Sequence, residues 1–139
     1  MTFEEAIRLI KKGDTISLRH ALDEGLDPNT SNHLNSTILM LAAMEGNTAM
    51  GRLLIGRGAD VNRENNLRDT ALTLAAMLGH AAFVKLLLDS GASTERIRER
   101  GALDSFLDWV ERYCKVSDAE MRNLRLLLMA NDAKRTDPA

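Results

Sequence analysis

The residues that could carry out a reaction are few and far apart in this sequence. It contains one cysteine, Cys114, and three histidines, His20, His33 and His80. Zinc sites built from histidine and cysteine need several such ligands at short, characteristic spacings, and these four residues show none. A cysteine hydrolase would need Cys114 to meet a histidine in the folded chain, whereas a lone cysteine on an amphipathic helix usually packs as a small apolar side chain. We therefore predict no enzymatic activity, no cofactor and no bound metal, and keep a Cys114-dependent hydrolase as a remote alternative.

Binding of phosphate groups or nucleic acid is not indicated either. The segment Gly56-Arg57-Gly58 is rich in glycine, but it lacks the lysine and the following serine or threonine of a phosphate-binding loop. The chain has 18 basic and 20 acidic residues and a net charge of −2, so it has no excess of positive charge to attract a nucleic-acid backbone. We expect no nucleic-acid partner.

The composition is that of an ordinary soluble protein. Apolar residues make up 45% of the chain, but no apolar run approaches the roughly 18 residues of a membrane-spanning helix. The sequence begins Met1-Thr2-Phe3-Glu4-Glu5, with acids where a secretory signal carries bases, and its single cysteine permits no internal disulfide. We expect a cytoplasmic protein that makes no membrane contact.

The elements that must position any functional side chain repeat along the chain at an interval of 33 residues. The segment 37–43 (TILMLAA) stands 33 residues before the segment 70–76 (TALTLAA). Two series of glycines keep the same interval: Gly13, Gly46 and Gly79, and Gly25, Gly58 and Gly91. A period of this length, with two helical segments per unit, is typical of a stacked repeat array.

Each unit reads as two helices and a loop. In the second unit, Ala42 and Ala43 lie on the apolar side of the first helix, and their small size lets a neighbouring helix approach closely. Gly46 is suited to end this helix in a left-handed conformation, and Asn47 is suited to cap the second helix. We expect the second helix to end near Arg57, before a turn-rich loop.

Capping residues mark the helix starts in the other units too. Thr2 and Glu5 fit a capping box at the first helix. Asp14 and His80 occupy the position of Asn47 in their own units. We therefore predict that Asp14 and His80 cap the second helices of the first and third units.

These features resemble the ankyrin repeat, whose pattern is roughly G-x-T-P-L-H-x-A-A-x-x-G-H, followed by an amphipathic helix that ends in L-L-x-x-G-A-D-V-N. The matching residues of the second unit are Thr37, Leu39, Ala42, Ala43, Gly46, Leu54, Gly58, Ala59, Asp60, Val61 and Asn62. Those of the third unit are Thr70, Leu72, Ala75, Ala76, Gly79, His80, Val84, Leu87, Leu88, Gly91 and Ala92. The proline and histidine of T-P-L-H are replaced in both units, by Ile38 and Met40 and by Ala71 and Thr73, which must change the local hydrogen bonding.

The resemblance implies an all-α fold, an ankyrin-repeat solenoid of about four stacked helix-turn-helix units with protruding hairpin-like loops. We expect a single domain over residues 1–139, with repeats at 1–33, 34–66, 67–99 and 100–134 and a frayed tail at 135–139. The first and fourth units match the pattern least, as expected for end units that face water on one side.

The fourth unit departs from the pattern in length. The segment 101–104 matches the segment 70–73 at an offset of 31, whereas the segment 126–128 matches the segment 86–88 at an offset of 40. Nine residues are therefore inserted between them, and we predict a lengthened first helix over 106–115. Ser117 and Glu120 fit a capping box for the second helix, which we expect Asn131 to close.

Gly51 stands inside a predicted second helix, where the third unit has Val84. Glycine in a helix interior costs about 1 kcal/mol relative to alanine, and the missing side chain leaves space unfilled. We therefore predict that the second repeat is the softest in the array.

Asn62 follows Leu54, Asp60 and Val61 in a pattern that resembles the asparagine-hydroxylation sites of some ankyrin proteins. The simpler interpretation, which we favour, is that its side chain bonds backbone groups in the turn.

In ankyrin-repeat proteins, the loop tips and the exposed side of the first helices form a concave surface that binds the partner. The corresponding residues here are His33, Leu34, Ser36, Met44, Glu45, Arg57, Asn66, Leu67, Asp69, Met77, Leu78 and Ser90, with Lys11 and Lys12 at the equivalent helix positions of the first unit. Apolar clusters rimmed by charge tend to be contact sites. We predict a protein-binding groove centred on Leu34, Met44, Leu67, Met77 and Leu78; the alternative is that these side chains pack onto the next repeat as additional core.

The loop 94–101 alternates arginines with acids. Its arginines are Arg96, Arg98 and Arg100. We expect them to pair with their acidic neighbours on a solvated surface. The alternative is that they bind an acidic partner, since arginine is enriched at binding hot spots.

The sequence thus predicts a monomer that works by binding a protein partner. Two roles remain open: a general adaptor, and a dedicated inhibitor or immunity-type protein that blocks an enzyme. We lean toward the inhibitor because no second domain is evident that would recruit another protein. An engineered scaffold without a natural partner is disfavoured by irregularities such as Gly51 and the lengthened fourth unit.

Overall fold

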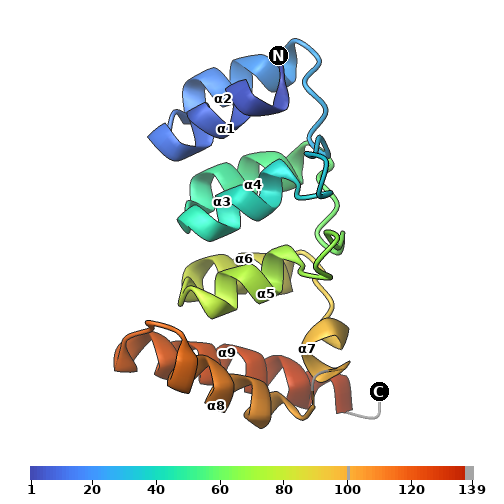
Figure 1. Cartoon of the computed structure of the whole chain (residues 1–139). Coiled ribbons are helices and arrows are strands. Elements are labelled where there is room, and N and C mark those ends of the chain that lie inside the picture. Colours follow the sequence, from blue (N-terminus) through green and yellow to red (C-terminus); the bar gives the residue numbers. More distant parts are fainter. Residues whose placement is uncertain (100, 137–139) are drawn as a thin grey trace.

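The structure is a computed structural model that describes residues 1–99 and 101–136 as helices joined by loops (Figure 1). The helices are α1 (Phe3–Lys12), α2 (Thr15–Asp23), α3 (Ile38–Glu45), α4 (Thr48–Gly56), α5 (Ala71–Met77), α6 (Ala81–Asp89), α7 (Glu95–Glu99), α8 (Leu103–Tyr113) and α9 (Asp118–Thr136). Extended pairing in this part of the chain is limited to an isolated antiparallel bridge between Ser31 and Thr37. Arg100 and the last three residues of the predicted tail lie outside the described residues.

The helices stack in pairs, and the pairs follow one another along the array. Figure 1 shows α1, α3, α5 and α8 in one layer and α2, α4, α6 and α9 in a second layer behind it. α3 packs on both α1 and α5, and α6 packs on both α4 and α9. One hydrophobic core runs through the stack, from Ala6 and Ile10 in α1 to Leu124 and Leu128 in α9. The predicted all-α repeat solenoid is confirmed.

The size of the buried side chains determines how the front layer packs. The pairs Ala42-Ala43 in α3 and Ala75-Ala76 in α5 are fully buried, and methyl side chains let neighbouring helix backbones lie close together. The fourth unit has Phe106-Leu107 at the corresponding positions, also buried. The strongest contacts of α8 are with α7 and α9. The last helix pair is therefore attached to the stack mainly through the packing of α9 on α6.

The first helix pair begins with the predicted capping residues. Thr2 Oγ1 accepts a hydrogen bond from the backbone N of Glu5 at 3.2 Å, and Glu5 Oε2 accepts one from the backbone N of Thr2 at 2.8 Å. Asp14 Oδ1 accepts from the backbone N of Ser17 at 3.0 Å, and the Ser17 hydroxyl donates to Asp14 Oδ2 at 2.7 Å. These two bonds stabilise the carboxylate and lower the pKa of Asp14. Both predicted caps are confirmed.

His80 stands at the N-cap position of α6 but makes no side-chain capping bond, so that prediction was wrong. Asn47 does cap α4, because its Oδ1 accepts from the backbone N of Met50 at 3.1 Å. His80 Nε2 instead lies 3.0 Å from the backbone O of Met44 at the end of α3. Its ring lies so close to Gly46 that a Cβ there would come within 2.5 Å of Nδ1. The imidazole reaches further than an asparagine side chain, and it joins the third helix pair to the second.

The fourth helix pair is longer than its counterparts at both helices. α8 has 11 residues, against 7 in α5, and this confirms the predicted lengthening. Ser117 and Glu120 form the predicted capping box, with both hydrogen bonds at 3.2 Å. The predicted closure at Asn131 was wrong, because α9 continues to Thr136. No glycine or proline occurs from 118 to 136, so the local sequence contains no strong stop signal.

Candidate functional site

Two hairpin-like loops, residues 30–37 and 63–70, follow the second helices of the first and second pairs and project at one side of the stack (Figure 1). Asn32 Oδ1 accepts hydrogen bonds from the backbone N–H groups two and four residues further along, at 2.9 and 3.0 Å. Asn65 Oδ1 makes the same two bonds, both at 2.9 Å. An asparagine therefore closes each tip. The sequence interpretation missed this role, although Asn32 and Asn65 keep the 33-residue interval.

The two tips are bonded to each other. The backbone N of Asn66 donates to the backbone O of Leu34 at 2.9 Å, and Asn35 Nδ2 donates to Asn66 Oδ1 at 2.8 Å. Leu34 and Leu67 hold equivalent places on the two tips and are both exposed, Leu67 to 70%. The two bonded hairpin tips thus expose two leucines at equivalent positions.

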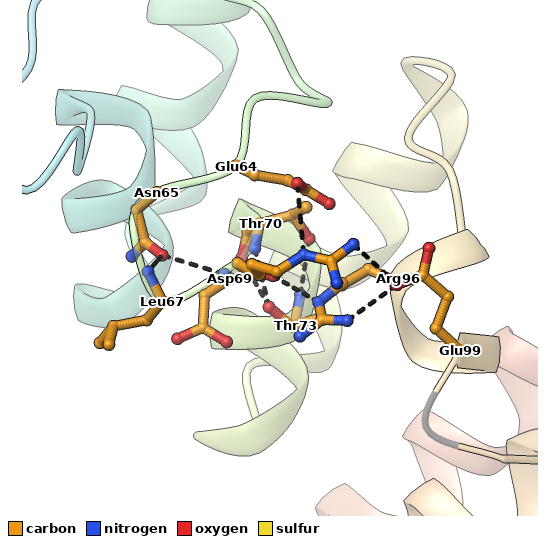
Figure 2. Close-up of polar contacts among 9 residues, drawn as sticks. Glu64, Asn65, Leu67, Asp69, Thr70, Thr73, Arg96 and Glu99 are labelled. Carbon is orange, nitrogen blue, oxygen red and sulfur yellow. Dashed lines mark hydrogen bonds and ion pairs between the residues drawn. The ribbon is translucent and has the colours of Figure 1, made fainter.

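α7 stands where the next hairpin would follow, and it is tied to the second one. Glu99 Oε2 accepts from Arg68 Nη2 at 3.0 Å and from Arg96 Nη1 at 2.8 Å, and Arg96 Nε donates to the backbone O of Arg68 at 2.6 Å. Figure 2 shows Arg96 and Glu99 beside the loop that carries Leu67. Arg98 forms an ion pair with Asp132 of α9. Arg96 therefore pairs with a neighbouring acid, as the first of the two interpretations of this segment expects, although its side chain is only 13% exposed. Arg98 pairs with an acid of α9 instead of one in its own loop.

The three apolar residues predicted to line the groove on the helices, Met44, Met77 and Leu78, differ in exposure. Met44 on α3 and Leu78 at the end of α5 are exposed, each to 44%. Met77 is half-buried and packs against the core. The alternative interpretation, in which these side chains become additional core, therefore describes Met77 but not Met44 or Leu78.

The other predicted partner-binding residues are polar. His33, Glu45 and Asn66 are exposed, and Ser36 and Asp69 are half-buried in the hairpins. Arg57, at the end of α4, forms an ion pair with Asp23 at the end of α2. Arg57 thus forms an ion pair that joins the second helix pair to the first.

An aromatic pair on α8 was missed by the sequence interpretation. Trp109 and Tyr113 are exposed, Tyr113 to 67%, and their ring centroids are 6.1 Å apart. They line an open depression of about 300 Å³ together with Ser105, Asp108 and Arg112. The offset of 31 that relates the fourth unit to the third places Trp109 level with Leu78, and this signal could have revealed it.

These exposed apolar residues together form what we call the inner surface. It comprises Leu34 and Leu67 on the hairpins, Met44 and Leu78 on α3 and at the end of α5, and Trp109 and Tyr113 on α8.

Comparison with known families agrees with this architecture. Residues 6–97 match the family described as ankyrin repeats (3 copies). The chain belongs to the ankyrin repeat family. Ankyrin repeats are generally protein-interaction modules.

Among solved structures, the crystal structure of the human ASB11 ankyrin repeat domain is similar to this ankyrin-repeat chain. The TM-score is 0.61 at 27% sequence identity, and the match covers 64% of this chain and 40% of that one. The chain therefore spans less than half of the ASB11 domain. A search of curated proteins found no match.

Asn62 has a structural role within the ankyrin repeats. Its Nδ2 donates to the backbone O of Gly91 at 3.3 Å, and its Oδ1 accepts from the backbone N of Ser93 at 2.7 Å. Asn29 makes the same two bonds one repeat earlier, at 3.1 and 2.7 Å. These bonds confirm the structural interpretation of Asn62, which links the loop after α4 to the loop after α6.

The residues considered for chemistry show no arrangement that favours a reaction in the described part of the chain. Cys114 is half-buried, and this burial raises the pKa of its thiol, which disfavours the reactive thiolate. Within residues 1–99 and 101–136, no group of three or more His, Cys, Asp or Glu side chains is placed to hold a metal ion. None of the helices in this part of the chain is both long and apolar enough to cross a membrane.

Proposed function

We propose that this ankyrin-repeat protein binds a protein partner through its inner surface. The observation that supports the proposal is the recurrence of exposed apolar side chains at equivalent positions of successive units, Leu34 and Leu67 on the hairpins and Leu78 and Trp109 on the helices, with exposed Met44 beside them on α3. Scattered single apolar residues are normal on a protein surface, but an aligned group rimmed by charge is typical of a contact site.

The residue types fit such a role. Tryptophan and tyrosine are enriched at binding hot spots, because a large ring buries much area and loses little conformational entropy. Methionine is flexible and adapts to irregular partners. We place His33, Ser36, Glu45, Asn66 and Asp69 at the polar rim, where they would contribute to specificity more than to affinity.

The proposal is tested by a pull-down from native cells with the double variant Met44→Glu/Leu78→Glu as bait. Both residues are exposed, so the free energy of unfolding should change by no more than about 0.5 kcal/mol per substitution. A buried charge at the centre of an interface should weaken partner binding by about tenfold or more. The partners retained by the wild type should therefore be lost.

A matched control is Ile16→Glu/Leu126→Glu. These residues are more exposed than Met44 and Leu78, and they lie on α2 and α9 in the other layer. The control should keep the partners. If both double variants retain the same proteins, the inner surface is not the binding site. If the protein is an inhibitor, the wild-type bait should recover one enzyme that is inactive while bound. If it is an adaptor, the bait should recover two partner proteins together.

A further inference from the structure

We propose that Arg96 is a positioning residue that fixes both hairpin tips in the arrangement in which Leu34 and Leu67 contact the partner. This inference rests on the proposed function, because it concerns the hairpin part of the same inner surface. Three observations carry it: the bonds that join each tip to the next unit, the burial of the Arg96 side chain, and the backbone conformation beside Leu67.

Each hairpin tip is bonded to the unit that follows it. Asn35 Nδ2 on the first tip donates to Asn66 Oδ1 on the second at 2.8 Å. At the equivalent positions one repeat later, Arg68 Nη2 donates to Glu99 Oε2 of α7 at 3.0 Å. The position of the first tip therefore depends on the second tip, and the position of the second tip depends on α7.

The two joints differ in their second bond. Between the tips this bond joins two backbones, because the N–H of Asn66 donates to the O of Leu34 at 2.9 Å. α7 is a helix, and the N–H groups of a helix point along its axis and not sideways to a neighbour. Arg96 supplies a donor from its side chain, since Nε donates to the backbone O of Arg68 at 2.6 Å. This bond ties the backbone next to Leu67 to α7 (Figure 2).

Arg96 is the best shielded of the three charged residues in this joint. Its side chain is 13% exposed, against 58% for Arg68 and 47% for Glu99. Exposed ion pairs add little stability, whereas a hydrogen bond from a charged donor that is shielded from water contributes more. Arg96 Nη1 also donates to Glu99 at 2.8 Å, so the planar guanidinium is held by its own helix while Nε bonds the tip.

The second tip is held in a conformation that its own residues do not favour. Arg68 has a φ of 62°, which is uncommon for a residue other than glycine, asparagine or aspartate. Leu67 beside it is 70% exposed, so core packing does not fix its side chain. α7, in contrast, is anchored in the core through Ile97, which is 1% exposed. Arg96 thus connects the exposed leucines to a buried anchor.

The bond affects affinity through the population of the bonded arrangement. Without it, the tips exchange between this arrangement and others, and only the bonded fraction binds a partner that contacts both leucines. The apparent dissociation constant then rises as the inverse of that fraction. Arg96→Met tests this, because it keeps the apolar stem of the side chain and removes both hydrogen bonds.

Amide hydrogen exchange measures the tips without a partner. The amide of Asn66 should exchange about tenfold faster in Arg96→Met than in the wild type, while buried amides of α5 and α6 keep their rates. Arg98→Met is the matched control, since Arg98 lies on the same helix but bonds Thr94 and Asp132. Unchanged exchange at Asn66 in Arg96→Met, or equal acceleration in Arg98→Met, would overturn the role of Arg96.

A second variant covers the case in which Arg96→Met does not fold. Arg96→Lys keeps the positive charge, but its single ammonium group cannot reproduce the two directions of the guanidinium fork. The amide of Asn66 should exchange faster in this variant too, and wild-type exchange would overturn the proposal.

Binding is measured with a peptide that is selected from a random phage-displayed library on the wild type and counter-selected on Leu34→Ala/Leu67→Ala. Its dissociation constant should rise about tenfold in Arg96→Met and stay within about twofold in Arg98→Met. Leu67→Ala should weaken binding about tenfold in the wild type, but no more than about threefold in the Arg96→Met background. The reason is that a leucine without a fixed position contributes little to binding.

The outcomes separate this inference from the proposed function. An equal loss of affinity on Leu67→Ala in both backgrounds would overturn the positioning role while leaving the binding surface intact, because a merely structural residue leaves the Leu67 effect unchanged. A library that yields no peptide dependent on the two leucines would count against the proposed function itself, whatever the exchange rate at Asn66.

Discussion

The second and third helix pairs share one 33-residue pattern, yet they contribute side chains of different size to the interface between them. Gly51 of α4 and Val84 of α6 hold equivalent positions, and both are buried. A Cβ on Gly51 would come within 2.7 Å of the ring of Phe83 and 2.9 Å of Leu86. The space left by the glycine is therefore filled by the next pair. A residue that weakens its own helix strengthens the contact between helices, so stability in this array is shared between neighbours.

The two pairs also begin differently. The side chain of Thr37 accepts from Met40, and the backbone N of Thr37 donates to the Met40 sulfur at 3.5 Å. In the third pair, the backbone N of Thr70 donates to Thr73 Oγ1 at 2.9 Å, and the Thr73 hydroxyl donates back to the backbone O of Thr70 at 2.9 Å. A hydroxyl is a stronger acceptor than a thioether, so α5 has the better-bonded first turn.

The largest effect is expected where the two pairs meet. Phe83→Ala should reduce the free energy of unfolding by about 3–5 kcal/mol, because it opens a cavity beside Gly51 and removes a fully buried ring. Urea unfolding measures the loss. Ile16→Ala, on an exposed side chain, should change stability by no more than about 0.5 kcal/mol. A loss at Phe83 below about 1.5 kcal/mol would mean that the site collapses and that Gly51 is not specifically matched to the ring.

Gly51→Ala should destabilise the protein by about 1–3 kcal/mol through overpacking against Phe83, although alanine favours a helix. In the Phe83→Ala background the same change should become stabilising, by up to about 1 kcal/mol, because the ring is gone. Gly56→Ala is the matched control, since Gly56 ends the same helix and a Cβ there meets nothing within 4 Å. If Gly51→Ala stabilises the wild type, the proposed fit between the two pairs is wrong.

The capping positions offer a smaller contrast. Asn47→Ala should cost about 1 kcal/mol because α4 loses its cap. His80→Ala should cost a similar amount for a different reason, the loss of the hydrogen bond to Met44 and of packing on Gly46. His80→Asn should fall within about 0.5 kcal/mol of the wild type, because a new cap offsets the lost bridge. Hydrogen exchange should locate the Asn47 effect in α4 and the His80 effect at the end of α3. Equal loss of protection in α6 and α3 would contradict this division.

The smallest effect is expected at the hairpin tips. Asn35 and Arg68 are equivalent and both adopt left-handed backbone, with φ of 58° and 62°. Asparagine tolerates this conformation better than arginine, whereas the exposed Arg68–Glu99 pair adds little stability. Arg68→Asn should therefore raise the free energy of unfolding by up to about 0.5 kcal/mol, and Arg68→Gln should lower it by a few tenths of a kcal/mol. Thermal unfolding that ranks Gln above Asn would show that the ion pair outweighs the backbone strain.

The prediction that the second repeat is the softest remains open to the same hydrogen-exchange experiment. One of its two reasons, the unfilled space at Gly51, does not hold, because Phe83 occupies that space. The other reason, the low helix propensity of glycine, is local and still applies. Protection of α4 equal to that of α6 would show that packing from the third pair fully compensates.

Much of the fold was predictable because its signals are local. The capping boxes at Thr2 and Ser117 join residues three positions apart, and Gly46 ends α3 through its own left-handed backbone. The overrun of α9 past Asn131 shows the limit of such signals: asparagine tolerates a helix end but does not enforce one. The candidate site was predictable to the extent that it follows the repeat, as Leu34 and Leu67 do. Met44 and its repeat equivalent, Met77, differ in burial.

The sequence by itself determined the period, the helix pairs and most helix starts, since each depends on hydrogen bonds and side-chain spacing within a few residues. Only the tertiary structure decided what Gly51 and His80 do, because their partners, Phe83 and Met44, are 32 and 36 residues away along the chain. It also decided that Met77 faces the core while Leu78 faces solvent, and that Trp109 is partly exposed. Such outcomes depend on how one helix pair packs against the next, and the local sequence of either pair alone does not determine that packing.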